Sequence, residues 1–115
     1  MMDNCIFCKI IKSEIPCTKV YEDDLILSFK DINAEAPVHV LIIPKKHISS
    51  INELQDEDLN IVAHIFNKAK DIALELGINE TGYRIVNNCG EDGGQTVQHL
   101  HFHMLGGRSL TWPPG

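Results

Sequence analysis

The sequence has no long apolar run and no excess of basic residues. No stretch approaches the roughly 20 consecutive apolar residues of a membrane-spanning helix, so we expect no membrane span. The formal net charge is −6, and the lysines are scattered apart from the pairs Lys9/Lys12 and Lys45/Lys46. This argues against a nucleic-acid polymer as partner, because proteins that bind one gather Lys and Arg on one face. A small phosphorylated ligand, which needs only a local site, is compatible with this charge.

The features of an exported chain are also missing. The N-terminal MMDNCIFCKI has neither a basic flank nor a sustained apolar segment, so we expect no signal peptide and a cytoplasmic location. In a reducing compartment the four cysteines should be thiols or metal ligands and not disulfides. A Walker motif and an acidic metal cluster are absent too, which argues against magnesium-dependent phosphoryl transfer.

The 115 residues show no repeat, linker or low-complexity tract, and we expect one domain over residues 1–115. Apolar residues recur at spacings of three and four over 56–76, which predicts one long helix. We expect a short helix over 6–11 and strands over 19–22, 25–30, 38–43, 83–87 and 99–105. Five short strands with the long helix between the third and fourth predict an α+β fold with a mostly antiparallel sheet.

The segment 99–105, HLHFHML, carries three histidines at alternate positions. In a strand, His99, His101 and His103 would share one face, with neighbouring rings rooted about 7 Å apart and the outer two about 13 Å apart. A zinc–nitrogen bond is only about 2.1 Å long, so two of these rings can share an ion but three in a straight strand cannot. The alternatives are packed or solvent-exposed histidines and a metalloenzyme with His101 and His103 as an H-x-H pair.

Cys5 and Cys8 form a C-x-x-C motif, a spacing that allows both sulfurs to reach one ion. No thioredoxin-like pattern follows the motif, which disfavours a redox pair. Zinc needs two further ligands, for which the candidates are His47, just after the predicted strand 38–43, and His99. On spacing alone, a Cys₂His₂ zinc site and a pair of packed thiols both remain open.

The histidine segment resembles the H-φ-H-φ-H-φ-φ motif that defines the histidine triad (HIT) family. The resemblance extends over nearly the whole chain, through IFCKII, YEDD, DINAEAPVH, IPKKHI, GYRIVNN, DGGQTVQHLHFH and WPPG. The WPPG end, with GGR before it, resembles the Hint branch of purine nucleoside phosphoramidases. The resemblance implies a five-stranded HIT-like α+β fold with one long and one short helix, and a homodimer in which the sheets join.

This resemblance implies a hydrolase that cleaves the P–N bond of purine nucleoside phosphoramidates and also acyl-nucleotidates. His101 would attack the α-phosphate and carry the nucleotidyl group. His103 and His39 would flank the phosphate, and His99 would orient His101 through its backbone carbonyl. The amine must be protonated before it leaves. Two proton donors are open: Thr96, which would relay a proton from a neighbouring acid, or a histidine.

The resemblance also assigns a nucleotide site. Asp31 matches the residue that holds the ribose hydroxyls. The alternative is that the Asp31 side chain only caps a turn. Trp112 would belong to a tail that reaches towards the partner subunit's site. The phosphate-binding loop, whose N–H groups from 94 to 96 would stabilise the phosphate, corresponds to Asn88, Gly94, Gln95 and Thr96. The nucleoside pocket, which would otherwise be plain core, corresponds to Ile6, Phe7, Phe29, Ile32 and Leu41.

HIT relatives that contain C-x-x-C bind zinc through both cysteines, a downstream histidine and the first histidine of the triad. The corresponding residues here are Cys5, Cys8, His47 and His99. Because all four positions around the ion would be filled, the implied role is structural. No organic cofactor is expected.

Two other functions compete with the phosphoramidase. A dinucleoside polyphosphate hydrolase of the same family would carry Gln near the last histidine of the triad, where this chain has Met104 and Leu105. The second is a nucleotide-binding regulatory protein with vestigial catalysis. The joint retention of four residues argues against it: His39, His101, His103 and Thr96.

Overall fold

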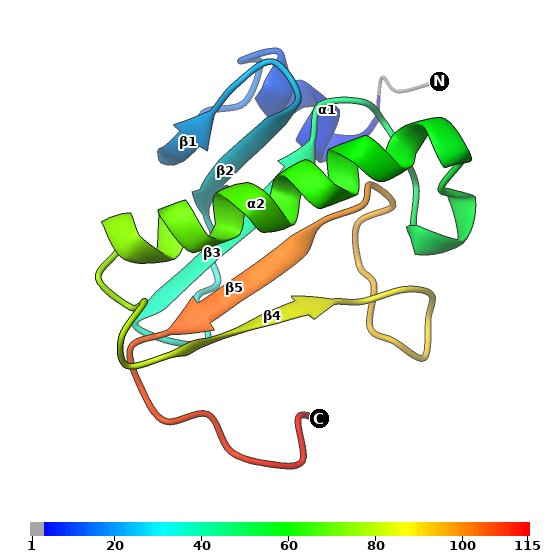
Figure 1. Cartoon of the computed structure of the whole chain (residues 1–115). Helices are drawn as coiled ribbons and strands as arrows, with labels where there is room; N and C mark the ends of the chain where they lie inside the picture. The colour runs from blue at the N-terminus through cyan, green and yellow to red at the C-terminus, as the bar shows by residue number, and fades with distance from the viewer. Residues whose placement is uncertain (1–3) are drawn as a thin grey trace.

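The frame of the protein is a five-stranded antiparallel sheet with the strand order β1-β2-β3-β5-β4. The structure is a computed structural model that describes residues 4–115. Its strands are β1 (Lys19–Glu22), β2 (Ile26–Lys30), β3 (Val38–Pro44), β4 (Tyr83–Asn87) and β5 (Phe102–Gly106). Together with the two α-helices this confirms the predicted α+β fold (Figure 1).

The long helix α2 (Leu59–Glu75) lies across one face of the sheet (Figure 1). Its buried residues Ile65, Ala69 and Ile72 pack against apolar side chains of β2, β3 and β5. The predicted start at residue 56 was three residues early, because Asp56–Asp58 form the 3₁₀ turn η2 after a first 3₁₀ turn, η1 (Ile51–Glu53). No helix within residues 4–115 has the length and apolarity to cross a membrane.

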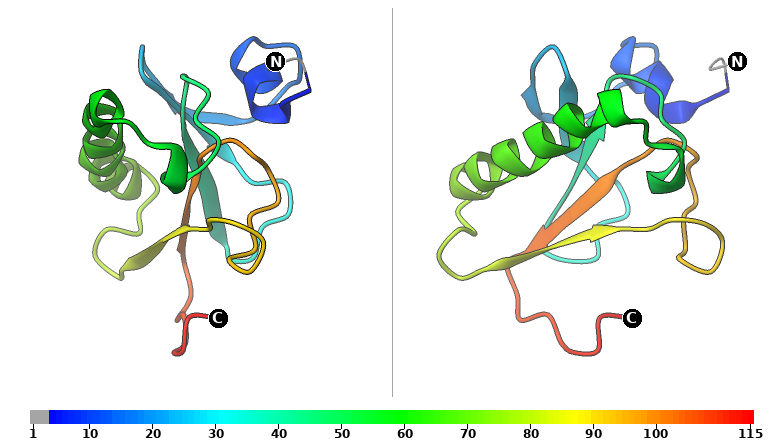
Figure 2. Two further views of the ribbon diagram at one scale, coloured as in Figure 1. Left: turned by 90° about the vertical axis from the view of Figure 1, so that its right-hand side faces the viewer. Right: turned by 45° about the vertical axis from the view of Figure 1, so that its right-hand side comes forward.

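The other face of the sheet is covered by the short helix α1 (Ile6–Ile11), so the sheet lies between the two helices (Figure 2). Alternation along β2 explains this arrangement, because successive side chains of a strand point to opposite faces. Ile26 contributes to the core under α2, whereas Leu27 and Phe29 pack with Phe7 and Ile10 of α1. Both faces therefore carry an apolar core.

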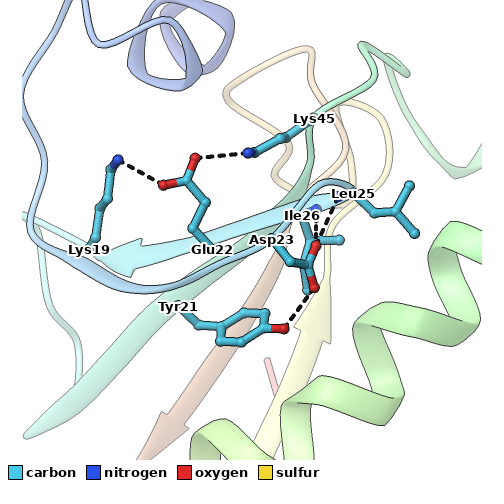
Figure 3. Close-up of polar contacts among 7 residues, drawn as sticks. All are labelled: Lys19, Tyr21, Glu22, Asp23, Leu25, Ile26 and Lys45. Atoms are coloured by element: carbon cyan, nitrogen blue, oxygen red, sulfur yellow. Dashed lines mark hydrogen bonds and ion pairs between the residues drawn. The ribbon is translucent and has the colours of Figure 1, made fainter.

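The hairpin β1–β2 turns at Asp23 and is tied to α2. The Asp23 carboxylate accepts hydrogen bonds from the backbone N–H groups of Leu25 (2.8 Å) and Ile26 (3.0 Å) and from the Tyr21 hydroxyl (2.7 Å) (Figure 3). It also lies 2.6 Å from Nε2 of His64 on α2. In the same view, Glu22 bridges Lys19 and Lys45 at 2.8 Å each (Figure 3).

Strand β5 begins three residues later than predicted, at Phe102. The predicted strand included His99 and His101, but both precede the ladder. The chain there bonds to other partners: the N–H of Leu100 donates to the carbonyl of Ile48 (2.6 Å), and the carbonyl of His101 accepts from Asn87 Nδ2 (2.8 Å). The three histidines therefore do not lie along one straight strand. The ring separations of about 7 Å and about 13 Å that a straight strand would impose do not apply to them.

Candidate functional site

A cavity of about 910 Å³ opens on the α1 face of the sheet. His39, His101 and His103 line it, together with Asp31 and Thr96. Its apolar wall contains all the residues expected in a nucleoside pocket, namely Ile6, Phe7, Phe29, Ile32 and Leu41. The fold thus gathers residues from α1, β2, β3, β5 and three loops around one space.

The donor and acceptor pattern assigns the tautomers of two of these histidines. The backbone N–H of Glu35 donates to Nδ1 of His39 (3.0 Å), so that nitrogen carries no proton. In the neutral ring the proton is on Nε2, which lies 2.9 Å from Nδ1 of His103 and donates to it. His103 in turn carries its own proton on Nε2. Asp31 supports this order, since its Oδ2 lies 3.4 Å from His39 Nε2.

The tautomer of His101 is opposite to that of its neighbours. Its Nδ1 lies 2.7 Å from the backbone carbonyl of His99, an oxygen that can only accept, so Nδ1 carries the proton. In the neutral ring, the Nε2 of His101 is then an unprotonated nitrogen with a free lone pair. Such a nitrogen is a nucleophile at neutral pH. The site therefore presents one nucleophilic ring (His101) beside one hydrogen-bond donor ring (His103).

Burial keeps the rings of His99 and His103 uncharged. It lowers the pKa of His103 to about 4, an effect that the nearby His101 and His39 increase and that Asp31 partly opposes. Burial likewise lowers the pKa of His99 to about 4. At pH 7 the rings of His99 and His103 are therefore neutral.

The expected phosphate-binding loop is used mainly for its own structure. The N–H of Gly94 donates to the carbonyl of Glu91 and that of Gln95 to the carbonyl of Gly90, both at 3.0 Å. The Gln95 side chain is buried, and its amide bonds to backbone groups of Gly90 (3.0 Å), Ser49 (2.7 Å) and Val97 (3.0 Å). Two of the three N–H groups expected to face a phosphate, those of Gly94 and Gln95, therefore already have carbonyl partners in this chain, and phosphate binding by the loop stays a prediction.

Three residues expected at the nucleotide site do not line the cavity: Asn88, Gly94 and Gln95. Thr96 does, and it contributes the hydroxyl that was expected there. Trp112 does not line the cavity either; its side chain is 80% exposed on the C-terminal segment that leaves β5 (Figure 1). Of the four expected loop residues, only Thr96 therefore lines the same cavity as the histidines within this chain.

A second cluster of donors lies beside the cavity. Cys5 Sγ is 3.4 Å from His99 Nδ1, and Cys8 Sγ is 3.3 Å from His47 Nδ1 and 3.6 Å from His99 Nδ1. The four donor atoms all lie within 4.8 Å of one another. Cys5 is the N-cap of α1 and Cys8 lies in its first turn, so the helix brings both sulfurs to one point.

The cluster fits a tetrahedral metal ion. With Zn–S bonds of about 2.3 Å and Zn–N bonds of about 2.1 Å, sulfur–nitrogen edges are about 3.6 Å, close to the observed contacts. His99 Nε2 lies 2.8 Å from the Pro44 carbonyl and donates to it, which leaves Nδ1 unprotonated towards the sulfurs. Burial, reinforced by Cys5, raises the pKa of Cys8 to about 11, so a nearby divalent cation is what would make this thiol a thiolate.

Sequence reasoning missed two polar contributors to the site. Asn87, at the end of β4, donates to the His101 carbonyl, and the backbone N–H of Glu35 sets the tautomer of His39. No local signal identifies either: Asn87 follows an ordinary strand pattern, and a backbone N–H carries no side-chain signature. The lining by Cys17 and Ile10 was missed as well.

Known proteins with similar sequence and structure share this architecture. Residues 4–111 match the family model described as "Scavenger mRNA decapping enzyme C-term binding". The chain is 52% identical over 115 residues to an uncharacterized HIT-like protein of Synechocystis sp., covering 100% of both. It is 47% identical over 112 residues to the 14 kDa zinc-binding protein of Zea mays, covering 96% of this chain and 87% of the relative.

Solved structures of HIT proteins are also similar to this chain. A HIT family hydrolase from Legionella pneumophila superposes with a TM-score of 0.95 at 54% identity, covering 97% of this chain and 100% of that one. A histidine triad protein from Clostridium difficile gives a TM-score of 0.92 at 52% identity, with 95% of both chains covered. The fold and the histidine cavity define an α+β protein of the HIT-like class. The chain belongs to the histidine triad (HIT) family.

Proposed function

We propose that this protein is a nucleoside phosphoramidase of the Hint branch, which hydrolyses purine nucleoside phosphoramidates and acyl-nucleotidates. The observation that carries the proposal is the pairing of opposite tautomers, with a free Nε2 on His101 beside an Nε2–H donor on His103. A phosphate between them would meet a nucleophile and a hydrogen-bond donor at once. The similarity to HIT family hydrolases supports a hydrolytic reaction.

The cavity suits a purine nucleoside monophosphate. Aromatic rings of Phe7 and Phe29, with centroids 5.6 Å apart, form an apolar wall against which a base can stack. The Asp31 carboxylate at the rim already accepts from the Asn33 N–H (2.8 Å). A carboxylate has about four acceptor positions, so Asp31 can still accept hydrogen bonds from ribose hydroxyls.

The reaction takes two displacements at phosphorus. His101 Nε2 attacks the α-phosphorus and forms a P–N bond to the ring, while the bond to the substrate nitrogen breaks and the nitrogen leaves as a protonated amine. The Thr96 hydroxyl and the Nε2–H of His103 are the candidate proton donors that line the same cavity. Water then attacks phosphorus, breaks the bond to His101 and releases the nucleoside monophosphate.

The assay is the release of AMP from adenosine 5′-phosphoramidate. We expect release by the wild type, none by His101→Ala, and unchanged release by His64→Gln, a matched control on the opposite face of the sheet. Diadenosine tetraphosphate in parallel tests the rival hydrolase of the same family. If neither substrate is cleaved but AMP binds, the regulatory nucleotide-binding protein replaces our proposal.

We further propose that Cys5, Cys8, His47 and His99 hold one structural zinc ion per chain. The donor geometry and the zinc-binding relative from Zea mays support this. Four filled positions leave no place for substrate on the metal, so the ion would supply charge and rigidity to its ligands. Metal analysis of purified protein should give about one zinc per chain, lost in Cys5→Ser; a metal-free wild type would contradict it.

A cytoplasmic homodimer is part of the proposal. Apolar side chains on α2 and β4 stay exposed in the single chain: Leu59 (55%), Phe66 (49%) and Tyr83 (36%). Within the described residues β4 pairs only with β5, which leaves its other edge free to extend the sheet into a second copy. The exposed Trp112 segment is then available to approach the partner's cavity.

A further inference from the structure

His99 takes part in two networks through two different groups. Its ring nitrogen Nδ1 lies among the donors of the cysteine cluster, 3.4 Å from Cys5 Sγ and 3.6 Å from Cys8 Sγ. Its backbone carbonyl, on the same residue, accepts the Nδ1–H of His101 at 2.7 Å. A shift of the His99 backbone that takes its ring out of the cluster therefore also moves the acceptor that fixes the nucleophile.

The cluster also holds the helix that walls the cavity. Between Cys5 and Cys8 lie Ile6 and Phe7, which both line the cavity. The Phe7 ring meets the rings of His101 and His99 edge to face, with centroids 5.2 Å and 5.8 Å apart. Cys5 and Cys8 therefore hold Ile6 and Phe7 from both sides of this short segment.

Few other polar contacts attach α1 to the protein. The helix has six residues, too few to be stable by itself. Among the described residues, the only side-chain hydrogen bonds from α1 and its N-cap to other segments are those of the two cysteines to His47 and His99. The rest of its attachment is the apolar contact of residues such as Phe7 and Ile10 with the sheet.

The cluster is reachable from outside. A smaller hollow of about 340 Å³ is lined by Cys5 and His47, and three residues of its wall also line the larger cavity: Ile6, Thr96 and Val97. Cys5 and His47 are only half-buried. A change in the cluster therefore has a short structural route to the nucleotide cavity, and a chelator has access to the metal.

We propose that the Cys₂His₂ centre controls nucleotide affinity: metal occupancy holds α1 and His99 in place, and metal loss opens the cavity wall. The inference rests on the proposed metal and nucleotide binding but goes beyond a structural zinc. A centre that only stabilises the fold would leave the affinity of the folded, metal-free protein unchanged. A controlling centre changes that affinity while the sheet stays folded.

The test is AMP affinity by calorimetry on zinc-loaded and chelator-stripped wild type, on Cys8→Ser, and on Cys89→Ser as the matched control outside both cavities. We expect affinity to fall at least tenfold on stripping and to return when zinc is added back to the wild type. Cys8→Ser should stay weak with zinc present, and Cys89→Ser should behave as wild type.

Hydrogen exchange supplies a second readout that does not depend on activity. Stripping should raise the exchange of amides in residues 9–12 at least tenfold and leave those of β5 protected. Equal affinity and equal exchange with and without zinc overturn the inference, and so does simultaneous loss of protection in β5, which would mean global unfolding. If the loaded wild type fails to bind AMP, the proposed function is wrong; if it binds AMP equally well when stripped, only this inference is wrong.

Discussion

Nε2 of His39 lies 2.9 Å from Nδ1 of His103, although 64 positions separate the two residues in the chain. The antiparallel pairing of β3 with β5 brings them together, with Leu41 opposite His103 and His39 opposite Leu105. Because Glu35 donates to the other nitrogen of His39, the proton order in this pair has one solution. The backbone thus decides which nitrogen of His103 faces a substrate.

The first prediction concerns this proton order. His39→Leu removes the donor to His103 Nδ1, so the His103 ring loses its fixed tautomer. We expect the kcat for AMP release to fall on the order of 10- to 100-fold, the usual effect of losing a hydrogen bond that orients a functional histidine. His39→Gln keeps an N–H donor and should recover part of the rate. Steady-state kinetics on both variants checks this, and equal rates for the two would contradict it.

The second prediction follows from the pKa of His103, which burial lowers to about 4. The ring should stay neutral down to about pH 5, so its ¹⁵N shifts should not titrate between pH 5.5 and 8. A midpoint near the ordinary value of about 6.5 would contradict this.

The same shift affects stability. An unfolded histidine binds a proton below about pH 6.5, whereas the folded one resists it down to about pH 4. The contribution of His103 to the free energy of unfolding is therefore complete above about pH 6.5. It decreases as the pH falls from about 6.5 to about 4. Denaturant titrations of wild type and His103→Gln from pH 7 to 4.5 should show a smaller acid loss in the variant.

The third prediction concerns Asn87, whose Nδ2 supports the carbonyl of His101 at 2.8 Å. Asn87 does not line the cavity, so Asn87→Ala should lower kcat and leave KM within about twofold. Loss of this hydrogen bond should also cost about 1 kcal/mol of unfolding free energy. Asn60→Ala, at an exposed position on α2, is the control. A rise in KM with constant kcat would assign Asn87 to substrate binding.

The fourth prediction separates structure from binding at Gln95. Its amide makes three partly buried hydrogen bonds to backbone groups, so Gln95→Leu should lower the free energy of unfolding by about 2–4 kcal/mol. Gln98→Leu, at an exposed position nearby, should have little effect. Thermal melting of both variants decides the point, and an unchanged melting temperature for Gln95→Leu would mean that the loop does not depend on this side chain.

The fifth prediction tests the proposed dimer. Phe66 is 49% exposed on α2, against Phe102 with ring centroids 5.6 Å apart. A charge at this place would be buried without a partner in a dimer, so Phe66→Glu should give a monomer by light scattering. Asn67→Glu, one position further round the helix, should remain dimeric. A wild type that is monomeric at micromolar concentration would refute the dimer itself.

Local patterns gave the elements of the fold with good accuracy. The predicted helix 6–11 and the strands 19–22 and 83–87 agree with α1, β1 and β4 residue for residue, because period and turn chemistry act within a few residues. The start of β5 was wrong for the opposite reason. His99 to His101 alternate like a strand, but their hydrogen-bond partners are Pro44, Ile48 and Asn87, which the pattern does not contain.

Residue types and their spacing identify the chemical groups of the site: three alternating histidines, a C-x-x-C pair with two candidate partners, and a threonine beside them. The roles of these groups follow from the folded arrangement. The proton positions on His39 and His101 follow from backbone groups of Glu35 and His99, which the local course of the chain places beside the rings. The pairing of β3 with β5 extends this proton order to His103, and the N–H groups of Gly94 and Gln95 are bonded within their loop. The reason is that a hydrogen bond depends on distance and direction in space, which residue type and spacing along the chain leave undefined.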